Sequence, residues 1–223
     1  MDSRTAEPTT RGKTIRRWAR FYDAVAWAMS LGRGGAIRDT AAKFAEIGDR
    51  ERVLDVGCGT GALAFAAKAR TPGAVVYGID ASPEMIDVAR RKAGRRRMPV
   101  EFEVAAIESL PFGNGEFDVV LSSLMLHHLP PDVKQAGLAE VVRVLKPGGR
   151  MVVVDFAGAG HGPIGHVAAL FGHGHTHGVV EDLLEAIRAA GFSQVEVAAT
   201  RFKSLVFVLA RIEPAAGVGD ATG

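Results

Sequence analysis

The chain has 223 residues, enough for one domain with a sizeable core, and a formal net charge of only +2. Its basic residues gather near 11–20 and 90–97 without a pattern of interleaved aromatic side chains, so we expect solvated helix faces and no nucleic-acid partner. The single cysteine, Cys58, excludes an internal disulfide. The lone cysteine, together with the lack of a secretory signal or a long apolar span, predicts a reduced, cytoplasmic location.

One domain is predicted over residues 13–212, between tails at 1–12 and 213–223 that we expect to be disordered. Helical patterns at 14–29 and 37–47 come first, and strands and helices then alternate. The predicted strands are 52–56, 75–79, 100–104, 117–122, 150–156, 195–199 and 205–210. Helices are predicted over 62–68, from Ser82-Pro83 onward, over 132–144 (stopped by residues 146–149) and over 180–190.

The last two predicted strands are separated by only about five residues, too few for a crossover helix. They therefore form a hairpin, and one of them runs antiparallel to the rest of the sheet. The alternation before them favours parallel pairing. The sequence thus predicts an α/β fold with a seven-stranded, mostly parallel sheet, one antiparallel strand and helices on both faces.

The most informative local pattern is the run 53–61, Val-Leu-Asp-Val-Gly-Cys-Gly-Thr-Gly, in which an apolar strand breaks into three alternate glycines before a helix. Glycine allows a sharp turn and a close approach of backbone to ligand. The helix behind the loop offers free N–H groups and the positive end of a dipole. Such a loop, at the carboxyl end of a first strand, is a ligand cradle.

Two ligands fit this cradle. Gly57, Gly59 and Gly61, with Ala62 as a further small residue and Asp80 as the later acid, satisfy a loose dinucleotide fingerprint. However, Asp55 stands two residues before the first glycine, where a carboxylate would crowd a pyrophosphate but suits an ammonium or sulfonium cation. The third glycine also comes at a spacing of two instead of three. These details favour S-adenosylmethionine.

Several motifs in order resemble those of class I S-adenosylmethionine-dependent methyltransferases, most like the ubiquinone/menaquinone C-methyltransferase-like group. The resemblance covers roughly residues 15–157 and the terminal hairpin, and it implies a Rossmann-like methyltransferase fold. The matching segments are 53–61, Gly78-Ile79-Asp80-Ala81-Ser82, Ser109-Leu110-Pro111-Phe112, 117–129 with Leu126-His127-His128-Leu129, and Leu145-Lys146-Pro147-Gly148-Gly149-Arg150.

The resemblance implies roles for particular residues. Asp80 would accept both ribose hydroxyls, and the glycines would pass under the methionine end and ribose of the cofactor. Ile107 would offer its N–H to the adenine, Ser122 its carbonyl to the ammonium group, and Met85 would pack on the adenine or simply in the core. The implied cofactor-binding set is Asp55, Gly57, Cys58, Gly59, Gly61, Asp80, Ala81, Met85, Ala106, Ile107 and Ser122.

One position departs from the family. The segment 105–108 reads Ala-Ala-Ile-Glu where the family usually has Gly-Asp-Ala-Glu, so Ala106 replaces the acid that holds the adenine amino group. One hydrogen bond of about 1 kcal/mol is then missing, and we expect a looser grip on adenine.

Candidate catalytic residues are His127, His128 and Tyr22. The two histidines follow the fourth predicted strand, where one could remove a proton from the acceptor. Being adjacent, they are not expected to both point inward, and the alternative is a cap and a solvated ring. Family members often close the site with their N-terminal segment, so residues 13–48 form a candidate helical lid. Tyr22 would close the site with a histidine or simply pack on its helix.

The segment 158–178 is rich in histidine, with His161, His166, His173, His175 and His177. Metal binding, contact with the acceptor and a mobile solvated loop all remain open, although methyl transfer in this family does not usually need a metal, and we predict none.

The expected function is in-line methyl transfer to a small-molecule acceptor at O, N or C. A second reading is a membrane-surface phospholipid N-methyltransferase, for which the basic helix 14–29 would contact lipid. A third is a non-catalytic cofactor- or metal-binding protein. The identity of the acceptor and the oligomeric state are not readable from the sequence.

Overall fold

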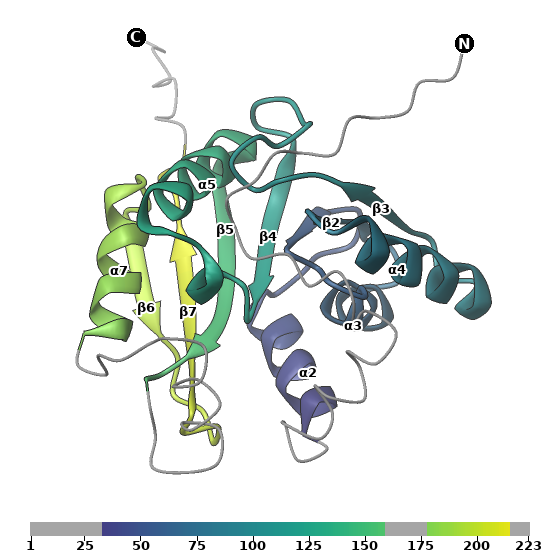
Figure 1. Ribbon diagram of the computed structural model, residues 1–223, viewed down its shortest axis with the longest axis horizontal. Coiled ribbons are helices and arrows are strands. Elements are labelled where there is room, and N and C mark those ends of the chain that lie inside the picture. Colours follow the sequence, from purple (N-terminus) through teal and green to yellow (C-terminus); the bar gives the residue numbers. More distant parts are fainter. Residues whose placement is uncertain (1–32, 159–177, 215–223) are drawn as a thin grey trace, which may run out of the picture.

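The computed structural model describes residues 33–158 and 178–214 (Figure 1). The predicted helix 14–29 with Tyr22, the five histidines of the 158–178 segment and nearly all of both predicted tails lie outside the described residues. Of the candidate lid, only the part from residue 33 onward is described.

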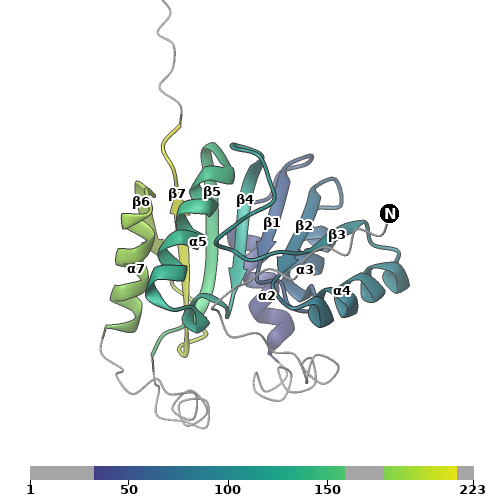
Figure 2. The same ribbon diagram turned by 45° about the horizontal axis from the view of Figure 1, so that its top comes forward.

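A seven-stranded sheet with the order β3-β2-β1-β4-β5-β7-β6 forms the centre of the domain (Figures 1 and 2). β7 is antiparallel to both of its neighbours, and every other pair is parallel, as the hairpin argument predicted. The strands are β1 (Arg52–Val56), β2 (Val75–Asp80), β3 (Val100–Val104), β4 (Phe117–Ser123), β5 (Leu145–Phe156), β6 (Gln194–Val197) and β7 (Leu205–Arg211).

Helices cover both faces of this sheet, and each face has its own apolar cluster. The helices are α2 (Gly34–Phe44), α3 (Ala62–Arg70), α4 (Pro83–Arg96), the 3₁₀ turn η1 (Leu126–His128), α5 (Pro131–Val144) and α7 (Val179–Ala189). Side chains from α2, α3 and α4 enter one cluster, and side chains from α5 and α7 enter the other. The predicted fold class is confirmed in both its sheet and its layers.

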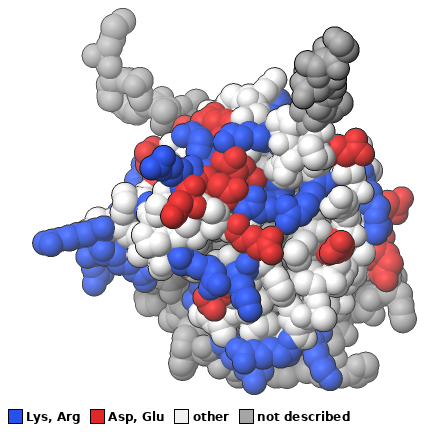
Figure 3. All heavy atoms as spheres, turned by 180° about the vertical axis from the view of Figure 1, so that it is seen from behind, with Lys and Arg blue, Asp and Glu red and all other residues white. Residues whose placement is uncertain are grey.

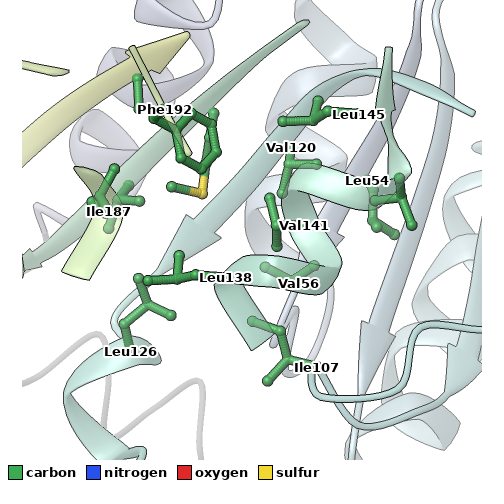
Figure 4. Close-up of a cluster of buried hydrophobic side chains, with 14 of the residues drawn as sticks. Leu54, Val56, Ile107, Val120, Leu126, Leu138, Val141, Leu145, Ile187 and Phe192 are labelled. Atoms are coloured by element: carbon green, nitrogen blue, oxygen red, sulfur yellow. The ribbon is translucent and has the colours of Figure 1, made fainter. Parts of the chain in front are cut away.

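The cluster beneath α5 and α7 also anchors two loops at the carboxyl edge of the sheet (Figure 4). Ile107, from the loop after β3, and Leu126, from η1 after β4, both reach into it beside Leu138 and Val141. Ile107 is 6% exposed and Leu126 is 1% exposed, so each fixes its loop by burying a large aliphatic side chain.

Local signals set several element boundaries as expected. Ser82 caps α4, because its Oγ accepts a hydrogen bond from the N–H of Met85, and Pro83 follows at the first helical position. β1 and β3 have the predicted bounds.

The start of β5 differs from the prediction, because the strand begins at Leu145 and not at Arg150. Phe117 of β4 pairs with Leu145, whereas Val119, two residues on, pairs with Arg150, so β5 carries extra residues in a bulge. Gly148 within this bulge has a φ of +77°. The glycine turn that ends α5 is therefore absorbed into the strand.

Candidate functional site

The glycine loop after β1 is tied to the end of β2. Gly57, Gly59 and Gly61 all have positive φ, at +65°, +53° and +82°, which non-glycine residues rarely adopt. Cys58 donates its N–H to the carbonyl of Ile79 over 2.8 Å, and Gly59 donates its N–H to Asp80 Oδ2 over 2.9 Å. The fold thus brings the loop and Asp80 together, as the sequence predicted.

The glycines serve different purposes. A Cβ on Gly57 would overlap the side chain of Met125, which follows β4, so the lack of a Cβ lets Met125 approach the loop closely. A Cβ on Gly61 would lie 2.6 Å from Cζ of Phe102 on β3, inside the protein. Gly61 is also the residue that caps α3. Position 61 is therefore glycine because Phe102 fills the space that a side chain would need, and the motif alone did not reveal this reason.

Asp55, at 1% exposed, is buried under this loop. Its Oδ2 accepts the N–H of Ala64 in the first turn of α3 over 2.9 Å, while its Oδ1 has no hydrogen-bond partner among the described residues. Burial, against the lowering effect of the Ala64 hydrogen bond and with a smaller contribution from the negative charge of Asp80, raises the pKa of Asp55 to about 8. A buried carboxyl with an unused oxygen fits a site that receives a cationic group.

Asp80 ends β2 with both oxygens facing backbone donors, Gly59 N–H at Oδ2 and Ser82 N–H at Oδ1, each over 2.9 Å. Burial raises the pKa of this carboxyl, although the two N–H groups act in the opposite direction. Each carboxylate oxygen has a second lone pair, so the group can still accept two hydroxyl hydrogens. The neighbouring Ala81 is half-buried, and Met85 on α4 is buried.

Cys58 is an interior residue. It is buried, its Sγ lies beneath the position of Gly78, and burial raises the pKa of the thiol well above its usual range. Its side chain therefore fills interior space beside β2.

The predicted adenine segment lies where β3 ends. Ala105 donates its N–H to the carbonyl of Asp80, and Ala106 is buried at 5% exposed. The side chain of Ile107 fills the space left by Gly137 on α5, where a Cβ would lie only 2.8 Å from Cγ2. Only backbone atoms of Ile107 therefore remain for a ligand, which agrees with the role assigned to its N–H.

Two residues of α5 hold this segment and were not foreseen. Glu140 Oε2 accepts the N–H of Leu110 over 2.9 Å. Arg143 donates to the carbonyls of Leu110 and Phe112 and pairs with Glu140. The acid and base three residues apart on a helix were the only signal in the sequence, and such pairs are common on solvated surfaces.

The position of Ser122 within β4 bears on its expected role. Leu124 donates its N–H to the carbonyl of Val154, so the even-numbered backbone groups of β4 face β5. Ser122 is paired with Val56 and Val153 inside the ladder. The odd-numbered backbone groups face β1, and β1 ends at Val56, which is paired with Ser122. The carbonyl of Ser123 therefore lies beyond the last pair and faces the glycine loop, so the geometry favours Ser123 over Ser122 for the carbonyl that meets the ammonium group.

On the other side of the edge, η1 places His127 against the end of β5. His127 Nδ1 lies 2.6 Å from Asp155 Oδ1, and the backbone N–H of His127 donates to Asp155 Oδ2 over 3.1 Å. The carboxyl of Asp155 is buried at 3% exposed, whereas the His127 side chain is 17% exposed. Asp155 was missed, although an acid at the end of the fifth strand lies next to the fourth strand in this topology.

His128 packs on His127, with ring centroids 3.8 Å apart and planes tilted by 45°. The 3₁₀ turn of η1 brings the two adjacent rings together. His127 contacts Asp155, and the ring of Phe156 meets His127 edge-on with a centroid distance of 4.8 Å. The structure therefore separates the two histidines, one anchored to a carboxylate and one stacked upon it.

Among the described residues, no group of three or more His, Cys, Asp or Glu side chains is arranged to hold a metal ion. None of the described helices is long and apolar enough to cross a membrane. On the face in Figure 3, acidic and basic side chains lie intermixed, so that face presents no field of a single sign.

Residues 53–149 match the family model described as a methyltransferase domain. The chain is 39% identical over 150 residues to a demethylmenaquinone methyltransferase of Thermus thermophilus, an alignment that covers 67% of each protein. It is 37% identical to a ubiquinone/menaquinone biosynthesis C-methyltransferase UbiE of a Geobacter species, over 61% of this chain and 58% of that protein. It is 36% identical to the O-methyltransferase cnsE of Penicillium expansum, over 66% of this chain and 54% of that protein. The chain thus spans about three fifths of the length of such relatives.

Solved structures share the fold. The crystal structure of the [4+2]-cyclase SpnF superposes with a TM-score of 0.69 at 20% identity, covering 94% of this chain and 100% of that one. A SAM-dependent methyltransferase from Aquifex aeolicus gives a TM-score of 0.68 at 21% identity, covering 85% and 97%. At these identities the likeness shows the architecture, and it agrees with the predicted Rossmann-like methyltransferase fold.

Proposed function

Because the chain belongs to the S-adenosylmethionine-dependent methyltransferases, we propose that it transfers a methyl group from that cofactor to a small, lipophilic acceptor by in-line displacement. When bound, the cofactor supplies a methyl group already activated on a sulfonium. The observation that carries the proposal is the cradle between β1 and β2, where three glycines of positive φ, the hydrogen bond from Gly59 to Asp80 and the buried carboxyl of Asp55 come together.

The residues of the cradle suit each part of the cofactor. Asp55 carries a buried oxygen that has no hydrogen-bond partner within residues 33–158 and 178–214, and a cationic group of the methionine end would supply one directly or through water. Asp80 has lone pairs left for the two ribose hydroxyls. The backbone of Ile107 and the side chain of Met85 would meet the adenine, and Ala106 offers no side-chain acceptor for its amino group.

The acceptor is a ring compound of the quinol or phenol type. The relatives named above are quinone C-methyltransferases and an O-methyltransferase, whose acceptors carry a proton that must leave. His127, in the η1 turn after β4, is the group that would take this proton. His128 lines the same turn, and Tyr22 stays a candidate for closing the site.

The chain accelerates transfer chiefly by alignment. Holding an acceptor in line with the methyl–sulfur bond supplies much of the rate, and burying both reactants keeps water out. The loops that would do this are anchored by Ile107 and Leu126 in one core, so the cofactor side and the acceptor side of the site keep a fixed relation.

The other readings are weaker. The names of the relatives do not support a phospholipid N-methyltransferase, and the helix 14–29 on which that reading depended lies outside the described residues. A non-catalytic cofactor-binding protein gains only from Ala106. A cytoplasmic location stays a prediction from the lone cysteine.

The test combines binding and transfer on the full chain. Calorimetry should show that S-adenosylmethionine binds, and that Asp80→Asn weakens binding at least tenfold, as expected when a charged acceptor of two hydroxyls is lost. The matched control is Asp49→Asn, an exposed acid in the turn before β1 at the opposite edge, which should leave the affinity unchanged.

Methyl-labelled cofactor is then offered with reduced naphthoquinones, phenols, amines and phospholipid vesicles. Label in the quinol or phenol supports the proposal. Label in phospholipid alone would replace it with the membrane-surface reading, and binding without transfer to any acceptor would support the non-catalytic one.

A further inference from the structure

The carboxylate of Asp155 is surrounded by nitrogen donors. Its Oδ1 faces His127 Nδ1 over 2.6 Å and the N–H of Phe156 over 2.8 Å, and its Oδ2 accepts the N–H of His127 over 3.1 Å. The side chain is almost fully buried at the end of β5. Two of the three donors are backbone N–H groups, which cannot exchange their role for that of an acceptor.

This arrangement determines which nitrogen of His127 carries the hydrogen. An ionised carboxylate only accepts hydrogen bonds, so Nδ1 must donate to Asp155. In the neutral ring the other nitrogen, Nε2, then keeps its lone pair. Asp155 thereby selects the tautomer in which Nε2 is the base.

The same contacts fix the direction of the ring. Asp155 holds His127 both at its backbone and at its imidazole, so the side chain cannot turn without breaking the bond to Oδ1. The ring is flanked by Phe156 from β5 and by His128 from its own turn. Within the described ranges, the titratable groups that contact it include Asp155 on the strand and His128 on η1.

We infer that Asp155 is a positioning residue that presents Nε2 of His127 as the proton acceptor, and that the site therefore takes a proton-bearing nucleophile, such as a phenol or hydroquinone. The inference rests on the proposed methyl transfer and adds the residue that orients its base and the nitrogen that takes the proton. The acceptor's proton passes to Nε2 as the acceptor's electron pair bonds the methyl carbon, and the former carbon–sulfur pair stays with the neutral thioether.

The competing explanation is that the Asp155–His127 pair only ties η1 to β5. Asp155→Asn separates the two, because an amide has one accepting oxygen and one donating nitrogen. If the amide oxygen keeps the backbone N–H of His127, the NH₂ group faces Nδ1, requires hydrogen on Nε2 and opposes the N–H of Phe156. If the amide is reversed, its oxygen still accepts Nδ1–H and the N–H of Phe156, and its NH₂ group opposes the backbone N–H of His127. Each orientation loses one backbone hydrogen bond, so the variant no longer fixes the hydrogen on Nδ1.

The first measurement is the tautomer itself, by nitrogen NMR of the full chain labelled in histidine, with His127→Gln used to assign the signal. In the unaltered protein we expect neutral His127 with hydrogen on Nδ1. In Asp155→Asn we expect the population to shift toward hydrogen on Nε2, and in Asp49→Asn no change. Hydrogen on Nε2 in the unaltered protein would overturn the inference even if Asp155→Asn failed to fold.

The second measurement compares a phenol that is neutral at the assay pH with a nitrophenol that is already ionised. For the neutral phenol, His127→Gln and Asp155→Asn should lower kcat about 10²- to 10⁴-fold, the usual contribution of general-base catalysis. The loss should be far smaller for the ionised phenol, with cofactor affinity unchanged for both. Equal losses for both phenols would mean that the pair is merely structural. Failure of any acceptor to react would count against the proposed function and leave the NMR result to decide the tautomer.

Discussion

The buried carboxyl groups on the two sides of the carboxyl edge of the sheet differ in how fully the protein satisfies their hydrogen bonds. On the β1–β2 side, Asp55 has an oxygen without a partner among the described residues, and burial raises the pKa of both Asp55 and Asp80. On the β4–β5 side, Asp155 is satisfied by three nitrogen donors of the protein itself. The first side is incomplete until a ligand arrives, whereas the second is complete before any ligand binds.

This difference fits two separate functions, cofactor binding on the β1–β2 side and proton transfer on the β4–β5 side. A binding site for a charged cofactor gains affinity if its acids are poorly satisfied when empty, because the ligand then supplies their missing partner. A group that moves a proton must instead be oriented in advance, since correct geometry contributes directly to rate. Changes on the two sides should therefore separate affinity from turnover.

The largest expected effect is on the β4–β5 side. His127→Gln should lower kcat for a neutral phenol or hydroquinone about 10²- to 10⁴-fold and leave the Kd of the cofactor within about twofold. Steady-state kinetics and calorimetry on the same sample give both values. A large rise in Kd would show that the two sides are not separate.

Next is Gly57→Ala on the β1–β2 side. The φ of +65° and the overlap with Met125 should together cost about 1–3 kcal/mol, seen as lower stability and up to about 100-fold weaker cofactor binding. The matched control is Gly94→Ala in α4, where an added Cβ meets nothing within 4 Å. This substitution should stabilise the protein by about 0.5–1 kcal/mol, because alanine favours the helix more than glycine does. Adding Met125→Ala should recover the part of the cost that comes from overlap. If Gly57→Ala and Gly94→Ala behaved alike, the close-approach role of Gly57 would be wrong.

A third effect depends on pH. Because the folded pKa of Asp55, about 8, lies above the usual value of 3.8 for an aspartate, the folded chain holds a proton that the unfolded chain has released between these pH values. This group should lower the stability of the ligand-free protein by up to about 1.4 kcal/mol per pH unit as pH rises through that window. Asp55→Asn should remove the slope, which urea titrations over the window would reveal; parallel curves for the two proteins would contradict it.

The same carboxyl should make cofactor binding pH-dependent in the opposite sense. A cationic group stabilises ionised Asp55, so binding should release a proton and tighten as pH rises toward 8. Calorimetry in two buffers with different heats of ionisation measures the released proton. Release unchanged in Asp55→Asn would assign the proton to another group.

The smallest effect is a gain at the adenine end. Ala106→Asp restores the family's acid and should tighten cofactor binding by about 1 kcal/mol, roughly fivefold. Because position 106 is buried, the ligand-free variant should also be less stable. Ala105→Ser serves as a neighbouring polar control. Unchanged affinity in Ala106→Asp would mean that the adenine amino group lies elsewhere.

Much of the fold was predictable because its signals are local. The hairpin of β6 and β7 follows from loop length, and the start of α4 follows from Ser82-Pro83. The bulge in β5 was not predictable, because residues 146–149 read as a turn and only pairing with β4 shows that the strand has already begun. The clamp of Glu140 and Arg143 on the loop after β3 was equally hidden, since its partners are about 30 residues away in the chain.

The sequence by itself determined the cradle: its glycines, Asp55, Asp80 and the strand and helix on either side are contiguous or fall at the ends of adjacent strands. Tertiary structure alone decided what each group contacts. Asp155 meets His127 across 28 residues only because β4 and β5 are neighbours, and Gly61 is small because Phe102 from another strand fills its place. Propensity and pattern act along the chain, whereas burial, tautomer and pKa depend on residues that the fold brings from elsewhere.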